Sequence, residues 1–156
     1  MRRAILVLMI VGMTGCANPV QHATASQRPE VCITKAKSSD IAARLASDFL
    51  DRGYTVLTQT ETRVEGEHIV DNAFAAALFG SRYDGTPKAR IAYTIVKIPA
   101  CTRVVADMNI VTNPGSAYER LTPMNNSQDS LKVQKFLDSV KVSFDKRYYA
   151  RRSVRF

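Results

Sequence analysis

Residues 89–112 read ARIAYTIVKIPACTRVVADMNIVT, and this stretch predicts the centre of the fold. Residues 89–98 and 102–112 alternate apolar with polar side chains, which is typical of β-strands that bury one face. The apolar set comprises Ile91, Tyr93, Ile95, Val104, Ala106, Met108 and Ile110. The Pro-Ala-Cys sequence at 99–101 is short enough for a tight connection, so the two strands should pair as an antiparallel hairpin.

Upstream of this hairpin, the pattern predicts a strand, a helix and a second strand. Residues 31–36 (VCITKA) and 54–63 (YTVLTQTETR) are rich in β-branched residues and favour strands. Between them, a helix should begin near residues 38–40 (Ser-Ser-Asp), which supply candidate N-caps, and should end at Gly53. Its apolar stripe comprises Ile41, Ala42, Leu45, Ala46 and Phe49.

Residues 64–88 are harder to assign because they mix glycines and Pro87 with an alanine-rich piece at 73–79 that favours a short helix. We interpret the segment as a long insertion between strands, and such insertions often carry binding residues. The candidate ligand contacts in this loop are Phe74, Phe79 and Tyr83. The alternative is an excursion that binds nothing.

Downstream of the hairpin, residues 113–116 (Asn-Pro-Gly-Ser) predict a turn, and the chain should remain irregular to residue 126. A final helix capped near residues 127–129 should then run toward Tyr149 on a broad apolar face. Together these elements predict a two-layer α+β domain over residues 30–145. Its mostly antiparallel sheet should have about four strands, with the helices packed on one face.

The positive charge of the chain is concentrated at its C-terminus. There are 22 basic and 14 acidic residues overall, but residues 146–156 contain no acid. The cations of this basic aromatic tail are Lys146, Arg147, Arg151, Arg152 and Arg155. They could contact an anionic membrane or an acidic partner, or form a solvated helix end whose charges complement the helix dipole.

The N-terminus has the pattern of an export signal. Arg2 and Arg3 precede an apolar run at 4–13, which is too short for the ~20 residues of a spanning helix. The run closes with Met-Thr-Gly-Cys at 13–16, which resembles the lipobox of bacterial lipoproteins, although Met13 stands where Leu is usual. The alternative is an ordinary secretory signal with an incidental Cys16.

The lipoprotein resemblance implies that residues 1–15 are removed and that Cys16 receives diacylglycerol and a further acyl chain such as palmitate. Residues 16–29 would then form a lipidated, flexible tether in which His22 has no special role. Ala17, where an Asp would favour the inner membrane, implies a lipid anchor in the outer membrane with the domain facing the periplasm. This location argues against a nucleic-acid partner despite the high pI.

Two cysteines remain for the exported domain. In an oxidising compartment, Cys32 and Cys101 are expected to form a disulfide, and closing a loop of about 70 residues would stabilise the fold by roughly 3–4 kcal/mol. The alternatives are two buried free thiols or a metal site, and the absence of a neighbouring His cluster argues against metal.

Motifs for catalysis are lacking: the sequence has no G-x-S-x-G elbow, H-E-x-x-H, phosphate-binding glycine loop or C-x-x-C. His68 is the one His in the predicted domain, and pairing it with Cys101 would require a free thiol. We therefore expect no enzyme activity, no cofactor and no metal. The first functional hypothesis is a membrane-anchored envelope lipoprotein that binds or braces another envelope component, such as a membrane-spanning assembly. The second is a lipoprotein that holds a small or lipidic molecule, with Phe74, Phe79 and Tyr93 lining its pocket.

The lipid anchor can be tested by the substitution Cys16→Ser, which removes the thiol that would be acylated. We expect the variant to lose its acyl mass and to be released into the periplasm, as measured by mass spectrometry and cell fractionation. Ala17→Ser is the matched control and should remain in the membrane fraction. Unchanged membrane retention of the Cys16→Ser variant would overturn the prediction of an anchor.

Overall fold

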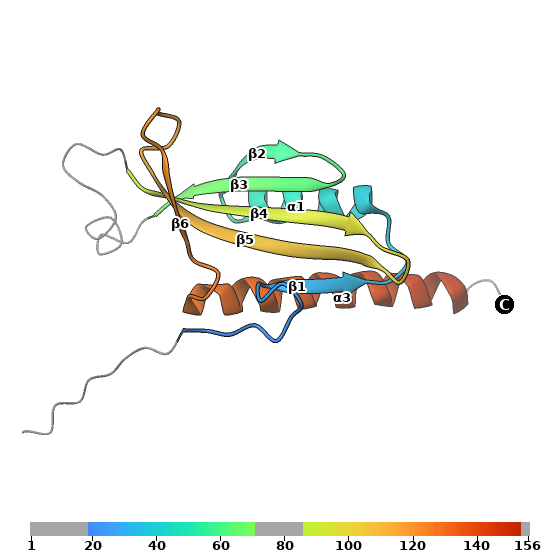
Figure 1. Cartoon of the computed structure of the whole chain (residues 1–156). Helices are drawn as coiled ribbons and strands as arrows, with labels where there is room; N and C mark the ends of the chain where they lie inside the picture. Colours follow the sequence, from blue (N-terminus) through green and yellow to red (C-terminus); the bar gives the residue numbers. More distant parts are fainter. Residues whose placement is uncertain (1–18, 71–85, 154–156) are drawn as a thin grey trace, which may run out of the picture.

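A computed structural model describes residues 19–70 and 86–153, with side chains described as far as Tyr148. Its described part is a two-layer α+β structure in which an antiparallel sheet has both helices on one face (Figure 1). The predicted fold class is confirmed. The predicted number of about four strands is wrong, because the sheet has six. The elements are β1 (Glu30–Ile33), α1 (Ser38–Asp51), β2 (Thr55–Gln59), β3 (Arg63–Ile69), β4 (Lys88–Lys97), β5 (Thr102–Thr112), β6 (Arg120–Pro123) and α3 (Gln128–Ser153).

The β4–β5 hairpin is the centre of the sheet, as the sequence predicts. The strand order is β1-β5-β4-β3-β2, and β6 also pairs with β5. The register runs from Lys88 opposite Val111 to Lys97 opposite Thr102 without interruption. Side chains that alternate along the two strands enter one core, which includes Tyr93 and Val104. The opposite face of the sheet carries charged residues instead.

The two helices cover different parts of the same sheet face. Helix α1 packs on β2, β3 and β4, whereas α3 packs on β1 and β5. Gly53 follows α1 with φ of 74°, a conformation that favours glycine and ends the helix. The predicted side-chain cap is absent, because the N-cap residue is Lys37 and makes no side-chain cap hydrogen bond.

Helix α3 is longer than the sequence suggests. Residues 146–153 continue it, so this part of the predicted separate tail is helical and joined to the domain. The mean hydropathy of α3 and the length of α1 both fall short of what crossing a bilayer requires, so neither described helix is a candidate membrane span.

The region of β2 and β3 corrects the sequence interpretation. Residues 54–63 are not one strand, and residues 64–69 are not part of a loop: β2 and β3 form a hairpin with a bulge between Val56 and Thr58. The glycine and the acidic residues at 65–67 suggested a loop. In the structure Gly66 faces α1, and a Cβ built on it would lie 2.9 Å from Cδ2 of Phe49. A glycine is therefore used here for close approach between helix and strand.

The short strand β6 was also missed. Residues 120–123 lie in the stretch that we expected to be irregular, yet they pair with β5 opposite residues 109–112. Pro123 argued against a strand, but it occupies the last position of an edge strand, where the missing N–H is tolerated.

In residues 19–29, the described part of the predicted tether, the chain packs on the domain at Val20, His22 and Pro29. The backbone N–H of Val20 donates to Asn126 O at 2.9 Å, and Pro29 is fully buried. His22 is only 8% exposed, and its Nε2 lies 2.7 Å from Ser130 Oγ and 3.2 Å from a backbone carbonyl. Because the Ser130 hydroxyl donates to Ser127 O, Nε2 must carry the proton and donate. His22 therefore fixes this segment to the start of α3.

The predicted pairing of the cysteines is present. A disulfide joins Cys32 on β1 to Cys101 at the β4–β5 turn, with a Cα–Cα distance of 5.6 Å and a sequence separation of 69. The residue pair Ile33–Thr102 beside it continues the β1–β5 ladder. The disulfide therefore ties the end of an edge strand to the central hairpin.

The disulfide has a direct test by mass. We expect the protein under non-reducing conditions to be lighter by two hydrogens than its reduced form, and reduction to lower the free energy of unfolding by roughly 3–4 kcal/mol on the chain-entropy model. Urea denaturation with and without reductant measures the second effect. Alkylation of both Cys32 and Cys101 without reductant would contradict the pairing.

The contact between strand and helix can be tested with Gly66→Ala. The added methyl group would press on the buried Phe49 ring, so we expect the free energy of unfolding to fall by about 1–3 kcal/mol. The measurement is a urea midpoint in a double-mutant cycle with Phe49→Leu. If the methyl clashes with the ring, Gly66→Ala should cost less in the Phe49→Leu background, and an equal cost in both backgrounds would exclude this clash as the cause.

Candidate binding site

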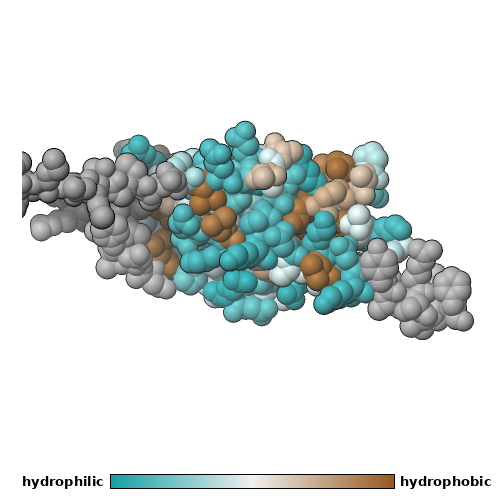
Figure 2. All heavy atoms as spheres, turned by 90° about the horizontal axis from the view of Figure 1, so that it is seen from below, coloured by the Kyte–Doolittle hydropathy of each residue, from teal (hydrophilic) through white to brown (hydrophobic). Residues whose placement is uncertain are grey.

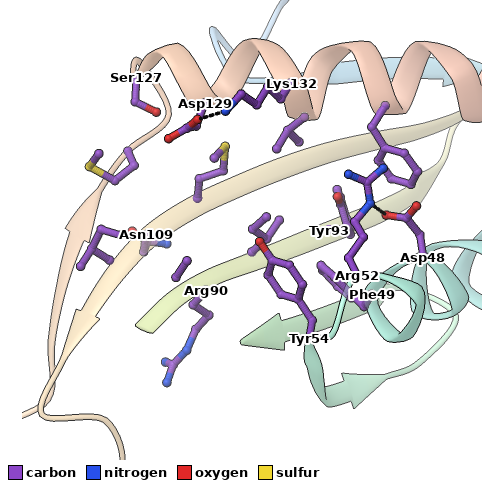
Figure 3. Close-up of a pocket in the computed structure, with 17 residues that line it drawn as sticks. Asp48, Phe49, Arg52, Tyr54, Arg90, Tyr93, Asn109, Ser127, Asp129 and Lys132 are labelled. Carbon is purple, nitrogen blue, oxygen red and sulfur yellow. Dashed lines mark hydrogen bonds and ion pairs between the residues drawn. The ribbon is translucent and has the colours of Figure 1, made fainter. Parts of the chain in front are cut away.

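A mostly apolar cavity lies between the two helices, over the central strands of the sheet. Its volume is about 300 Å³, and its walls come from the C-terminal end of α1, the first turns of α3, and β4 and β5 (Figure 3). The lining residues are Asp48, Phe49, Arg52, Tyr54, Ala89, Arg90, Ile91, Tyr93, Met108, Asn109, Ile110, Met124, Ser127, Asp129, Lys132, Val133 and Phe136. This volume is at the lower end of the range for small-molecule sites.

A series of aromatic rings gives the cavity its shape. Phe49 lies between Tyr54 and Tyr93, with ring centroids 5.2 and 5.3 Å away, and Tyr93 in turn lies 6.3 Å from Phe136. Aromatic pairs at these separations attract one another beyond their area of burial. The rings therefore form a preformed apolar wall.

Two phenol groups bring polarity into this apolar wall. In the described part of the chain, neither the Tyr54 nor the Tyr93 hydroxyl has a hydrogen-bond partner, although Tyr93 is only 2% exposed. The Tyr54 hydroxyl points into the space between the sheet and α3 (Figure 3). Burial raises the pKa of both tyrosines above the ordinary value, so both phenols stay protonated and can donate a hydrogen bond.

The rim of the cavity carries two ion pairs. Arg52 lies 2.8 Å from Asp48 on α1, and Lys132 lies 2.7 Å from Asp129 on α3 (Figure 3). The Arg52 guanidinium also sits 5.0 Å from the centre of the Phe136 ring. Each of these two cations is thus already matched by a nearby acid. The rim favours no particular charge, and selectivity would come from the apolar wall and the phenols.

A third polar atom lies at the α3 end of the cavity. Ser127 Oγ is buried, and no hydrogen-bond partner for it exists among the described residues. A buried hydroxyl without a partner costs free energy, so Ser127 is an unfavourable feature of this end of the cavity.

The open face of the sheet is occupied by a network of charges. Glu67 is 6% exposed and accepts hydrogen bonds from Lys88 at 2.9 Å and from Arg90 at 2.8 Å. Arg90 also donates to Glu119 at 2.7 Å, and Arg63 donates to Glu65. Burial alone would raise the pKa of Glu67, but the hydrogen bonds from Lys88 and Arg90 outweigh it and lower that pKa. These groups satisfy one another, so the network stabilises the β3–β4 pair and leaves no free acid or base.

His68 and Cys101, the pair considered for catalysis, lie far apart in the sheet. His68 is opposite Ala89 near one end of β4, whereas Cys101 follows the other end and is joined to Cys32. The His68 Nδ1 lies 2.6 Å from Ile69 O, and a second cavity of about 290 Å³ adjoins it. The Glu67–Lys88 ion pair forms part of that cavity wall. In the described ranges, no three His, Cys, Asp or Glu side chains group as metal ligands would.

The structure describes only some of the residues that the sequence marks as candidates. Tyr93 lines the cavity, and Lys146 and Arg147 are exposed on α3. Arg151 and Arg152 fall within the helical range, but their side chains are not described. Cys16, Phe74, Phe79, Tyr83 and Arg155 lie outside the described residues.

Most of the cavity was not anticipated. Its residues come from two helices and two strands that are far apart in the sequence, and no local spacing joins them. Tyr54 offered the one usable signal, because a tyrosine directly after a helix-ending glycine lies where α1 meets the sheet.

Broad apolar surface is absent from the face that α3 presents. Figure 2 shows this face as mostly hydrophilic, with hydrophobic residues in small separate patches. Elsewhere, exposed apolar side chains such as Leu57 and Tyr118 belong to different elements. A flat apolar docking surface would favour bracing as the function, whereas a mostly apolar cavity that opens to solvent favours a bound small molecule.

Comparison of the chain with protein-family models, with curated proteins and with solved structures found no match.

Proposed function

We propose that this chain is a non-enzymatic lipoprotein of the cell envelope, anchored in the outer membrane, that binds a small and mostly apolar molecule between α1 and α3. The lipobox-like sequence ending at Cys16 supports the location. The aromatic cavity of about 300 Å³ supports ligand binding and is the observation that carries the proposal.

The proposed ligand follows from the chemistry of the cavity. The aromatic rings and methionines of the cavity would pack against a flat or aliphatic part of the ligand. The two phenols could donate hydrogen bonds to one or two oxygen or nitrogen atoms of the same ligand. Because the rim cations are paired with acids, a neutral or zwitterionic molecule fits better than a strongly charged one. We infer binding without catalysis because the phenols remain protonated and Cys101 is held in the disulfide.

A second candidate function is to brace another envelope protein. Its support is the β5–β6 connection, where Tyr118 is 83% exposed, and Leu121 on β6, which is 50% exposed. Exposed aromatic residues are common at protein interfaces. Crosslinking of the intact lipidated protein in cells, followed by mass spectrometry, would recover such a partner.

Ligand binding can be tested with the neutral fluorescent probe N-phenyl-1-naphthylamine. Ala89 lines the cavity, and the substitution Ala89→Leu would fill part of it. We expect the probe to bind the unsubstituted chain and the Ala89→Leu variant to bind it at least about tenfold more weakly, which corresponds to about 1.4 kcal/mol. Since the chain contains no Trp, the probe can be excited with little interference from the protein.

The matched control is Thr94→Leu, which adds a similar apolar group to the same strand at an exposed position. This variant should bind the probe as the unsubstituted chain does. Equal probe affinity in the two variants would show that the cavity is not the binding site. Native mass spectrometry of the purified chain would then identify any molecule retained from the cell.

A further inference from the structure

We propose that the end of the sheet formed by the β4–β5 turn, the β1–α1 connection and the C-terminal part of α3 is a docking surface for an anionic lipid bilayer. Its defining residues are Lys35, Lys37, Lys97, Ile98, Lys146 and Arg147, here called the basic end. This surface is separate from the cavity, and the inference does not depend on the ligand proposed for that cavity.

Four contacts hold the three segments of the basic end together. The disulfide joins β1 to the β4–β5 turn, and Thr102 Oγ1 donates to Ala36 O at 3.1 Å, so the β1–α1 connection lies against the turn. The Lys35 ammonium donates to the Tyr148 hydroxyl at 2.7 Å, which fixes the connection to α3. Thr34 adds a hydrogen bond to Asp145 at 3.1 Å. Figure 1 shows the turn and the C-terminal part of α3 at the same end of the molecule.

The basic end gathers five cations that form no ion pair within the described residues. At the other end of the sheet, Lys88 and Arg90 are each paired with glutamates. Within the described ranges, none of the five cations of the basic end lies at ion-pair distance from a carboxylate, and all five residues are exposed. Unpaired exposed cations that share one surface create a positive potential that attracts anionic partners.

An apolar tip projects among these cations. Residues 96–100 are all exposed, and they include Val96, which is 45% exposed, and Ile98, which is 38% exposed. Pro99 and Ala100 complete the turn without adding a charge. The turn therefore offers aliphatic side chains to whatever partner the lysines attract.

A bilayer fits this combination of cations and an apolar tip better than an anionic polymer does. A phospholipid surface offers both phosphate headgroups for the lysines and an apolar interior for the tip, and each Lys or Arg near such a surface contributes about 1 kcal/mol. A polysaccharide of the cell wall would use the cations but would leave Val96 and Ile98 in water. Lysine is also a compact charge on a flexible stem, which suits mobile headgroups.

The experiment is flotation of the full-length Cys16→Ser variant, which lacks the thiol that would be acylated, with vesicles of phosphatidylcholine alone or of phosphatidylcholine mixed with phosphatidylglycerol. Any N-terminal contribution is present with both vesicles, so the difference in binding reports on the charge-dependent surface. We expect stronger binding to the mixed vesicles, and added salt should remove this preference. Lys97→Gln or Lys146→Gln should each weaken binding to mixed vesicles about fivefold, the fold-change that corresponds to about 1 kcal/mol.

Two matched controls lie away from the basic end. Arg120→Gln removes an exposed cation from β6 and is the control for the two lysine variants. Leu57→Ser removes an exposed apolar side chain from β2 and is the control for Ile98→Ser, which removes an apolar side chain from the tip. Ile98→Ser should weaken binding to mixed vesicles, and both controls should leave it unchanged. Equal binding to both kinds of vesicle would overturn the proposal, as would equal losses in the controls. Binding to isolated peptidoglycan without binding to vesicles would assign the surface to a polymer and would also overturn it.

Discussion

The packing of the Phe49 ring against the backbone of Gly66 is the constraint on which the helix–sheet arrangement depends. A strand normally presents a side chain at every second position to the helix above it, but β3 presents bare backbone here, and the ring of α1 occupies the space. Phe49 is 2% exposed and touches the rings of Tyr54 and Tyr93. The cavity wall is therefore a continuation of the core, and its preformed shape follows from the packing that holds α1 on the sheet.

The two faces of the sheet are stabilised by different interactions. The covered face excludes water with aliphatic and aromatic side chains from every layer. The open face carries acids and bases on neighbouring strands, where Glu67 and Arg90 are directly opposite in the register and complete each other's hydrogen bonds. Opposite charges on paired strands also favour the correct register, because a slip by one residue would bring these charges to the apolar face. The register of the β3–β4 pair is thus favoured both by the apolar side chains on the covered face and by the charge pairs on the open face.

The sequence predicted the parts of the fold that rest on local patterns. The β4–β5 hairpin and the core of α1 follow from alternation and helical spacing, and both were located closely. Strand β3 was missed because Gly66 and its flanking glutamates have the composition of a loop, and only their partners Phe49, Lys88 and Arg90 give them a place in a strand. His22 was misread for the same reason, since its partner Ser130 lies 108 positions away. The disulfide was predictable because the export-signal pattern led us to expect an oxidising compartment and left two cysteines, Cys32 and Cys101, to pair. The cavity was not predictable, because it exists only once α1 and α3 lie side by side.

The link between Cys32 and Cys101 also decides what a break in the backbone would do. Helix α1 and strands β2, β3 and β4 all lie within the covalent ring that this bond closes. A protease that cut one peptide bond anywhere in the ring would produce two polypeptides that remain one molecule until the disulfide is reduced. The N-terminal piece would also keep β1 in its ladder beside β5. A nicked copy would therefore not shed half of its mass, and any N-terminal attachment would still hold the part that carries α3.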